Sequence, residues 1–257
     1  MISSFDNAQV KRIRRLQKDK RYRYREQAFV VEGTRLIQEL AANSKRPKSI
    51  FYTEDWLADA EHEAFFKTVN LAGELVTNEV MAVMSDTETA SGILAVTSMI
   101  PIPLPTQPSL VLILDAISTP GNLGTMMRTA GAAGIDSVLL APGCVDAYNP
   151  KVIRGAMGAH FRLPIHHLDW EEIASYCQSL DIWVAETANG IIYTEVPWRQ
   201  PSAIIIGNEA WGAGIEAHSV AKGSIIIPMA GGTESLNAAT ASAVLLFEAF
   251  RQRGFSS

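Results

Sequence analysis

Long apolar runs in the second half of the chain predict strands that are buried on both faces. These runs consist mainly of Val, Ile, Leu and Ala, and helical patterns separate them. They are Leu110–Leu114, Val138–Leu140, Ile182–Ala185, Ala203–Ile206 and Ser224–Ile227. Strands without polar alternation are typical of a mostly parallel sheet that is covered by helices. The pattern therefore predicts an α/β domain.

Three segments in this half have the spacing of helices. Asn122–Ala133 and Asp169–Ser179 lie between predicted strands, and Ser235–Arg251 comes last. The last segment repeats apolar residues at helical intervals. They are Leu236, Ala239, Ala243, Phe247 and Phe250. The Ala-rich start of this helix would let another helix or a second subunit approach closely.

The first half of the chain predicts a smaller α/β domain. An amphipathic helix, Thr34–Ala42, follows the first of several short apolar runs. The predicted strands are Ala28–Val31, Ser49–Tyr52, Glu74–Val76 and Ile93–Val96. Four prolines within residues 101–108 favour an extended connector after this domain. We therefore expect domains at residues 1–97 and 109–257, with a Pro-rich linker at 98–108.

Composition and residue spacing indicate where the protein is located and whether it binds a metal. The 257 residues are 47% hydrophobic and 19% charged, as in a globular protein. No apolar run approaches the roughly 20 residues that cross a bilayer, and no signal peptide is apparent. Cys144 and Cys177 match no metal or redox spacing, and the histidines have no metal-ligand spacing. We expect a cytoplasmic protein with no membrane contact and no metal.

The charge is distributed unevenly along the chain. Residues 1–48 hold 13 basic and 5 acidic residues, whereas the whole chain has a net charge of −5. Nine basic residues lie between Lys11 and Arg25, opposed only by Asp19. Such a one-sided cluster favours contact with a polyanion over a solvated helix face. The predicted nucleic-acid contacts are Lys11, Arg12, Arg14, Arg15, Lys18, Arg21, Arg23 and Arg25. Tyr22 and Tyr24 could stack on bases or belong to the core.

Three predicted strands end in loops that are rich in Gly and polar residues. The loops cover residues 115–124, 207–214 and 228–237. Each loop alone could be an ordinary strand-to-helix turn with capping residues. None contains a dinucleotide-binding or P-loop glycine pattern, which disfavours those enzyme classes. Because ligands bind at the carboxyl ends of parallel strands, the three loops together predict a site.

Taken in order, these loops resemble the motifs of SpoU-type RNA 2′-O-methyltransferases of the SPOUT superfamily. The matching blocks are residues 114–130, 206–209 and 227–239, with further matches at 146–154 and 158–164. Val31–Leu36 resembles the start of the L30e-like RNA-binding domain of many members. Ser118-Thr119 departs from the usual Gln-Asp, and Ala156 stands where many members have Ser. These departures bear on the RNA substrate more than on the reaction.

The resemblance implies a SPOUT domain with a deep trefoil knot that binds S-adenosylmethionine, in a homodimer with its active site near the subunit interface. The residues matched to the cofactor site are Gly207, Ile227, Pro228, Met229 and Leu236. Arg128 matches the arginine proposed to act on the ribose 2′-hydroxyl. A guanidinium normally stays protonated, so two roles remain open: proton acceptor assisted by a phosphate, or a clamp on phosphate and ribose. The residues expected to position the ribose and the loops are Asn122, Glu209, Ser235 and Asn237.

The function implied by the resemblance is methylation of a ribose 2′-hydroxyl in RNA. Ribosomal RNA is the preferred substrate because of the L30e-like domain, and transfer RNA is second. One alternative is an RNA-binding protein of the same fold without activity. Another is a cofactor-dependent enzyme that acts on a small molecule, which the Lys11–Arg25 cluster disfavours.

Overall fold

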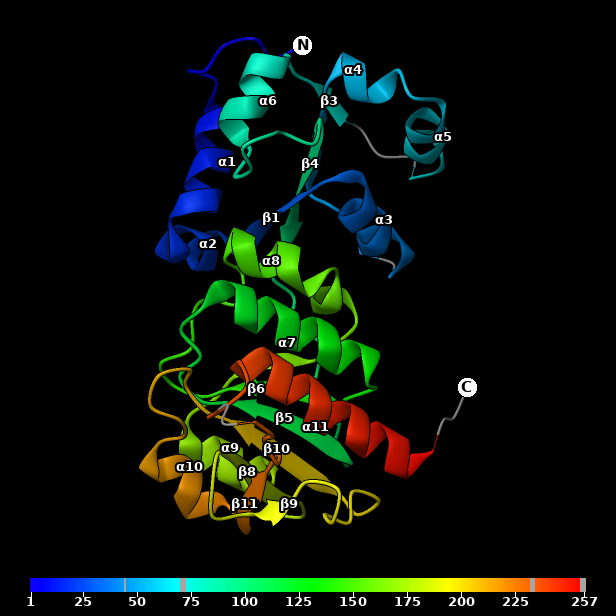
Figure 1. Ribbon diagram of the computed structural model, residues 1–257. Helices are drawn as coiled ribbons and strands as arrows, with labels where there is room; N and C mark the ends of the chain where they lie inside the picture. The colour runs from blue at the N-terminus through cyan, green and yellow to red at the C-terminus, as the bar shows by residue number, and fades with distance from the viewer. Residues whose placement is uncertain (44, 70–72, 232–233, 255–257) are drawn as a thin grey trace. The chain divides into compact units, whose positions relative to one another are not determined.

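The computed structural model describes residues 1–43, 45–69, 73–231 and 234–254. Its contacts divide the chain into two compact units (Figure 1). Unit 1 comprises Met1–Ile100 and Tyr148–Phe161, and unit 2 comprises Pro101–Ala147 and Arg162–Ser257. A short segment from the second half of the sequence thus packs with the N-terminal unit. Gly232 and Thr233, in the third predicted loop, lie outside the described residues.

Unit 1 contains a four-stranded mixed sheet. The order is β1-β4-β2-β3, with β4 antiparallel to both β1 and β2 and with β3 parallel to β2. The strands are β1 (Ala28–Glu32), β2 (Ser49–Tyr52), β3 (Gly73–Leu75) and β4 (Ile93–Ser98). The helices are α1 (Ala8–Lys18), α2 (Lys20–Glu26), α3 (Thr34–Ala42), α4 (Glu54–Leu57), α5 (Ala60–Val69), α6 (Asn78–Met84) and α8 (Pro150–Ala156), with a 3₁₀ turn at Ala159–Phe161.

Alternating residues of β1 pack into two different clusters. Ala28 and Val30 pack with α1 and α6, whereas Phe29 and Val31 pack with α3. The second cluster also includes Ile153 and Phe161. Because both faces of the sheet are covered, the strand is buried along its whole length.

Helices α1 and α2 are separated by a capping residue. Asn7 caps α1 by accepting a hydrogen bond from the Gln9 backbone N–H. Asp19 ends α1 and caps α2, since its carboxylate accepts from the Tyr22 N–H at 3.0 Å. The basic segment therefore forms two short helices that begin and end at polar caps.

Unit 2 contains a seven-stranded sheet, and every recorded strand pair in it is parallel. The order is β7-β6-β5-β10-β8-β11-β9. The strands are β5 (Leu110–Leu114), β6 (Ser137–Leu140), β7 (Ile165–His167), β8 (Asp181–Glu186), β9 (Ile191–Ile192), β10 (Ser202–Ile206) and β11 (Gly223–Ile226). The predicted parallel α/β domain is confirmed. The short strands β7 and β9 escaped prediction because they lack an apolar run of adequate length.

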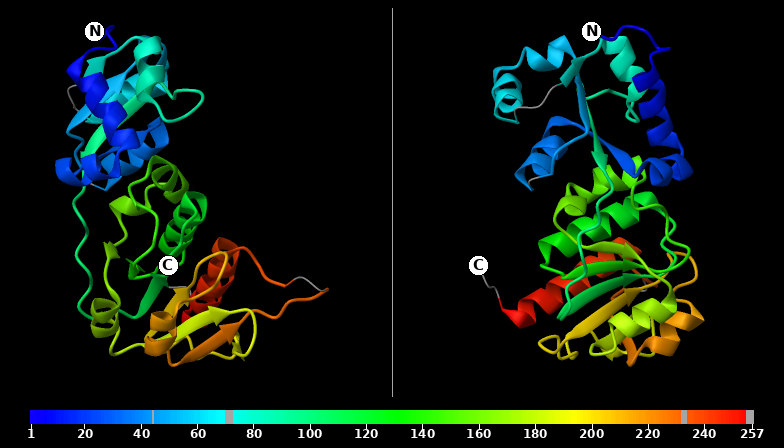
Figure 2. Two further views of the ribbon diagram at one scale, coloured as in Figure 1. Left: turned by 90° about the vertical axis from the view of Figure 1, so that its left-hand side faces the viewer. Right: turned by 180° about the vertical axis from the view of Figure 1, so that it is seen from behind.

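Four helices flank this sheet within the described residues. Ile173 of α9 (Trp170–Tyr176) and Ala217 of α10 (Ile215–Val220) pack against strand residues such as Val111 and Ile113. Helices α7 (Pro120–Ala132) and α11 (Ala238–Arg253) pack against each other, and lie together on the opposite side of the sheet in Figures 1 and 2. No described helix is long and apolar enough to cross a membrane.

Helix α11 differs from its prediction in start and in buried face. It begins at Ala238, because the Asn237 side chain caps it and accepts from the Ala239 N–H at 2.9 Å. Leu245, Leu246 and Ala249 are buried. The predicted stripe instead faces outward at Phe247, which is 47% exposed.

Candidate active site

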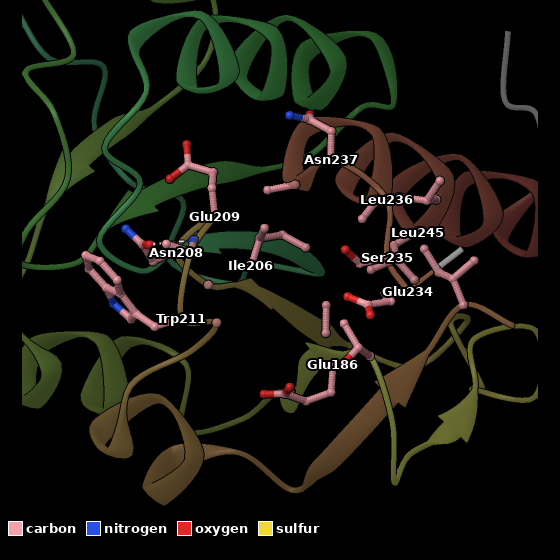
Figure 3. Close-up of a pocket in the computed structure, with 18 of the residues that line it drawn as sticks. Glu186, Ile206, Asn208, Glu209, Trp211, Glu234, Ser235, Leu236, Asn237 and Leu245 are labelled. Atoms are coloured by element: carbon pink, nitrogen blue, oxygen red, sulfur yellow. Dashed lines mark hydrogen bonds between the residues drawn. The ribbon is translucent and has the colours of Figure 1, made fainter. Parts of the chain in front are cut away.

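A pocket of about 530 Å³ lies in unit 2 at the carboxyl ends of the central strands (Figure 3). Strand β8 ends at Glu186, and β10 leads into the loop at residues 207–212. Figure 3 shows Asn208 and Glu209 across the pocket from Ser235 and Leu236. The site forms where the rule for parallel sheets places ligands.

Gly207 permits the second loop to fold back on itself. A β-carbon at this position would overlap the backbone of Gly212 and Ala213. Backbone hydrogen bonds between Asn208 and Gly212, at 2.9 and 3.0 Å, hold that close approach. Only glycine leaves room for this arrangement, and the loop forms one wall of the pocket.

Glu209 connects the second loop to the first. Its carboxylate accepts hydrogen bonds from the Ser118 N–H at 3.3 Å and the Ser118 hydroxyl at 3.2 Å. It also accepts from the Thr119 N–H at 3.2 Å and from the Asn122 amide at 3.0 Å. Thr119 is the N-cap of α7 and Asn122 lies in its first turn, so the carboxylate lies at the end of the helix that favours a negative charge. Glu209 thus stabilises the start of α7 beside the pocket.

These hydrogen bonds keep Glu209 ionised. Burial alone would raise the pKa of its carboxyl, but hydrogen bonds from its own N–H, the Asn122 amide and the N–H groups of Ser118 and Thr119 outweigh it and lower the pKa to about 2. The carboxylate is therefore a permanent acceptor at neutral pH and has no capacity to act as a general acid there.

Asn122 also connects to the third loop. The Asn237 amide donates to the Asn122 carbonyl oxygen at 3.3 Å, and the Asn237 carbonyl oxygen caps α11. The chain Glu209–Asn122–Asn237 therefore joins all three predicted loops through side chains. The predicted proximity of Asn122, Glu209 and Asn237 agrees with this arrangement.

Two further side chains stabilise the second loop. The Asn208 amide donates to the Ala116 carbonyl at 2.6 Å. The buried Asp115 carboxylate accepts from the Gly214 N–H at 2.7 Å, and burial raises the pKa of that carboxyl. Neither residue was among the predicted site residues, although both lie in the matched motifs.

The remaining predicted residues differ in their placement. Ile227, Met229, Ser235 and Leu236 line the pocket together with Gly207. Pro228 and Arg128 do not line it. Arg128 lies on α7, is exposed, and has no hydrogen bond or ion pair within the described part of the chain. The sequence analysis missed Glu186, Glu234, Trp211 and Leu245, which also line the pocket and have no distinctive spacing.

The two thiols are not activated. Burial raises the pKa of Cys144 to about 11 and that of Cys177 to about 12. Thiols with such pKa values are poor nucleophiles at neutral pH. Over the described ranges, no group of three or more His, Cys, Asp and Glu side chains is positioned to hold a metal ion.

The predicted RNA-binding residues lie on α1 and α2 of unit 1. Most are exposed or half-buried, and some form surface ion pairs, such as Lys11 with Asp6 at 2.9 Å. The Tyr22 ring is covered by the guanidinium groups of Arg15 and Arg25, at 4.3 and 4.8 Å, and packs against the core. This arrangement favours the interpretation of Tyr22 as a core-edge residue.

Arg23 is a correction to the predicted RNA contacts. Its side chain is 3% exposed and donates to the carbonyls of Leu16 and Gln17 at 2.6 and 3.1 Å. These carbonyls end α1 and have no helical partner. Arg23 therefore stabilises the helix pair from inside, and the prediction that it contacts RNA was wrong.

Comparison with known proteins identifies the family of each part of the chain. The SpoU rRNA Methylase family matches residues 109–247, and the MRM3-like substrate binding domain matches residues 7–95. The 23S rRNA (guanosine(2553)-2′-O)-methyltransferase of Bacillus subtilis is 34% identical over 250 residues, which cover 96% of this chain and 97% of that protein. The mitochondrial rRNA methyltransferase 3A of Danio rerio is 33% identical, covering 94% of this chain and 68% of that protein.

Solved structures resemble the fold over nearly the whole chain. An RNA 2′-O ribose methyltransferase has a TM-score of 0.84 and 30% identity, covering 98% of both chains. An AdoMet-bound rRNA methyltransferase from Sinorhizobium meliloti has a TM-score of 0.85 and 26% identity, covering 97% of both chains.

The parallel sheet and these matches together identify the chain as a methyltransferase with an α/β fold, as the sequence motifs predicted. The chain belongs to the SpoU rRNA methylase family.

Proposed function

We propose that the protein methylates a ribose 2′-hydroxyl of ribosomal RNA with S-adenosylmethionine as methyl donor. The main structural support is the hydrogen-bonded chain Glu209–Asn122–Asn237, which joins three loops around one pocket. A protein that only binds RNA has no evident need for this arrangement. The named activities of the Bacillus subtilis and Danio rerio relatives support ribosomal RNA over transfer RNA, which stays the second candidate.

The pocket has the chemistry that this cofactor requires. Ile206, Ile227 and Leu236 provide apolar surface for an adenine ring, and the loop that Gly207 permits leaves backbone groups at the wall. Glu186 and Glu234 also line the pocket, and carboxylates are favourable near a positive sulfonium. The residues present therefore fit the group. When bound, S-adenosylmethionine supplies an activated methyl group.

The protein's own task is alignment. Glu209 and Asn122 fix the start of α7, and this helix also carries Arg128. Because Arg128 has no partner within the described residues, its guanidinium is available to a phosphate and a ribose. Bidentate arginine contacts orient such groups well. We therefore favour Arg128 as a clamp, with phosphate-assisted proton acceptance as the alternative role.

RNA binding is assigned to residues 1–97, with 98–108 as linker and 109–257 as the catalytic part, except that Tyr148–Phe161 packs with the N-terminal unit. The exposed cations of α1 and α2, including Arg14, Lys18 and Arg21, support this assignment. The match of residues 7–95 to a substrate binding domain supports it as well. A cytoplasmic location and a trefoil knot remain predictions from the sequence, which cell fractionation and an experimental structure would test.

We further propose a homodimer. Helix α11 presents the exposed Phe247, whose ring makes an edge contact with Phe250 at 6.0 Å, and half-buried Ala243 on its outer side. An apolar helix face of this kind suits a second copy of the chain. Phe247→Arg is expected to convert dimers to monomers in analytical ultracentrifugation, and an unchanged sedimentation coefficient would contradict this interface.

The activity is tested by transfer of radiolabelled methyl from S-adenosylmethionine to unmodified total RNA, followed by nuclease digestion. We expect a 2′-O-methylated nucleoside in ribosomal RNA. Label only in the transfer RNA fraction would select the second candidate. Cofactor binding without transfer to any RNA would contradict the proposal, and RNA binding without cofactor binding would favour the non-catalytic alternative.

A further inference from the structure

A second pocket, of about 300 Å³, lies entirely within unit 1. It involves none of the predicted RNA contacts on α1 and α2. Its walls come from three parts of the chain: the ends of β1 and β4, the segment after α3, and the segment around α8. The lining residues that matter below are Phe29, Lys45, Arg46, Tyr148 and His160.

Aromatic rings form one wall of this pocket. The half-buried ring of Tyr148 lies 5.0 Å from Phe29 and 5.6 Å from His160, measured between ring centroids. Phe29 is 3% exposed and stacks on the buried Phe161 ring at 6.5 Å, so it supports the wall from behind. The wall is therefore held in place by the core of the unit.

Two cations lie at the same pocket. Lys45 is half-buried and Arg46 is exposed, and neither forms an ion pair with any described carboxylate. Backbone hydrogen bonds from Lys45 to Leu40 at 3.2 Å and from Lys48 to Val96 at 2.7 Å attach this segment to α3 and β4. The segment thus presents positive charge from a fixed backbone.

The aromatic wall continues toward the basic helices. The Tyr24 ring of α2 makes an edge contact with Tyr148 at 6.2 Å, and the Lys20 amino group lies 5.7 Å from the Tyr24 ring centre. A cation and two neighbouring rings therefore lead from α2 to this pocket, which Lys45 and Arg46 also line. Rings and cations at one surface suit a polyanion whose repeating units each carry a flat ring and a phosphate.

We propose that this pocket binds an unpaired nucleotide of the RNA substrate, with the base against Tyr148 and His160 and a phosphate on Lys45 and Arg46. The inference rests on the proposed RNA function and adds a second anchoring point to it. Charge and rings together favour a nucleotide, because an acidic peptide would use the cations alone and an apolar ligand would use the rings alone.

The test uses the full chain and a ribosomal RNA fragment, with fluorescence anisotropy for binding and methyl transfer for kcat and KM. Lys45→Ala/Arg46→Ala is expected to weaken binding and raise KM about tenfold, and to lower the salt slope by about 0.7 for each lost phosphate contact. Tyr148→Leu is expected to weaken binding with an unchanged salt slope, because stacking is not ionic. Tyr148→Phe keeps the ring and should restore binding.

The matched control is Lys67→Ala/Lys222→Ala, which removes two surface cations that pair with Glu63 and Asp181, away from this pocket. It should leave RNA affinity and slope unchanged, and kcat and cofactor affinity should be unchanged in every variant. Wild-type affinity and slope in Lys45→Ala/Arg46→Ala would overturn the proposal. Since anisotropy needs no turnover, failure of the methylation proposal would appear separately, as absent transfer by the wild-type chain.

Discussion

The loops around the unit 2 pocket and the helices α1 and α2 differ in how their polar groups are engaged. Glu209 accepts four hydrogen bonds from groups at fixed positions. By contrast, Arg14, Lys18 and Arg21 are exposed and form no ion pair in the described part of the chain. Aligning reacting atoms requires preorganised geometry, whereas binding a polyanion gains from solvated cations that release its counterions. One region is therefore sensitive to shape and the other to charge.

The largest effect on activity is expected at Arg128, a charged side chain that we propose aligns the reacting groups. Arg128→Ala should lower kcat about 1,000-fold, within the range for a lost orienting or proton-transfer group. Binding of S-adenosylmethionine, measured by calorimetry, should stay near wild type because Arg128 does not line the pocket. Arg128→Lys, which keeps the charge without the planar fork, should recover little activity. Full turnover in Arg128→Ala would remove its assigned role.

Gly207→Ala tests the role of shape. The added β-carbon overlaps the backbone of Gly212 and Ala213, so the loop has to move. Cofactor affinity should fall about 10- to 100-fold, as expected for a displacement that costs 1–3 kcal/mol. Gly131→Ala is the matched control, since the nearest atom to its β-carbon would be 3.8 Å away. Equal affinity in the two variants would show that the close approach is not needed for binding.

The same contrast explains what the sequence could predict. The apolar runs anticipated β5 and β10, and the ordered motifs anticipated that Asn122, Glu209 and Asn237 lie together. Charge alone marked the segment that forms α1 and α2 as the predicted RNA contact. It does not reveal which basic side chain is buried. Arg23 was misassigned because its partners are backbone carbonyls, which have no sequence signal. The outward face of α11 was also unpredictable, since apolar spacing is the same for core and interface.

A matched pair of variants tests whether the positive charge of α1 and α2 contributes to RNA binding. Arg14→Ala/Lys18→Ala/Arg21→Ala should weaken RNA binding about tenfold or more and flatten its salt dependence by about 0.7 to 0.9 for each lost contact. Its melting temperature should stay near wild type, because these side chains are exposed. Arg23→Ala should do the reverse, losing about 1–3 kcal/mol of stability from two unpaired carbonyls with an unchanged salt slope. If both variants changed only the slope, the inward placement of Arg23 would be contradicted.

The smallest effect concerns the pH dependence of the Glu209 network. A carboxylate whose folded pKa is lowered to about 2 stabilises the fold above its ordinary pKa, and this stabilisation is lost as pH falls toward the folded value. Glu209→Gln replaces an acceptor of four hydrogen bonds with a group that brings its own donors. The variant should therefore unfold at lower urea concentration at pH 7, and the difference from wild type should stay constant down to about pH 5 and shrink below it. A difference that persisted unchanged at pH 3 would mean that packing, and not the charge of Glu209, holds the first loop to the second. In that case the contrast between the two regions would lie in burial alone.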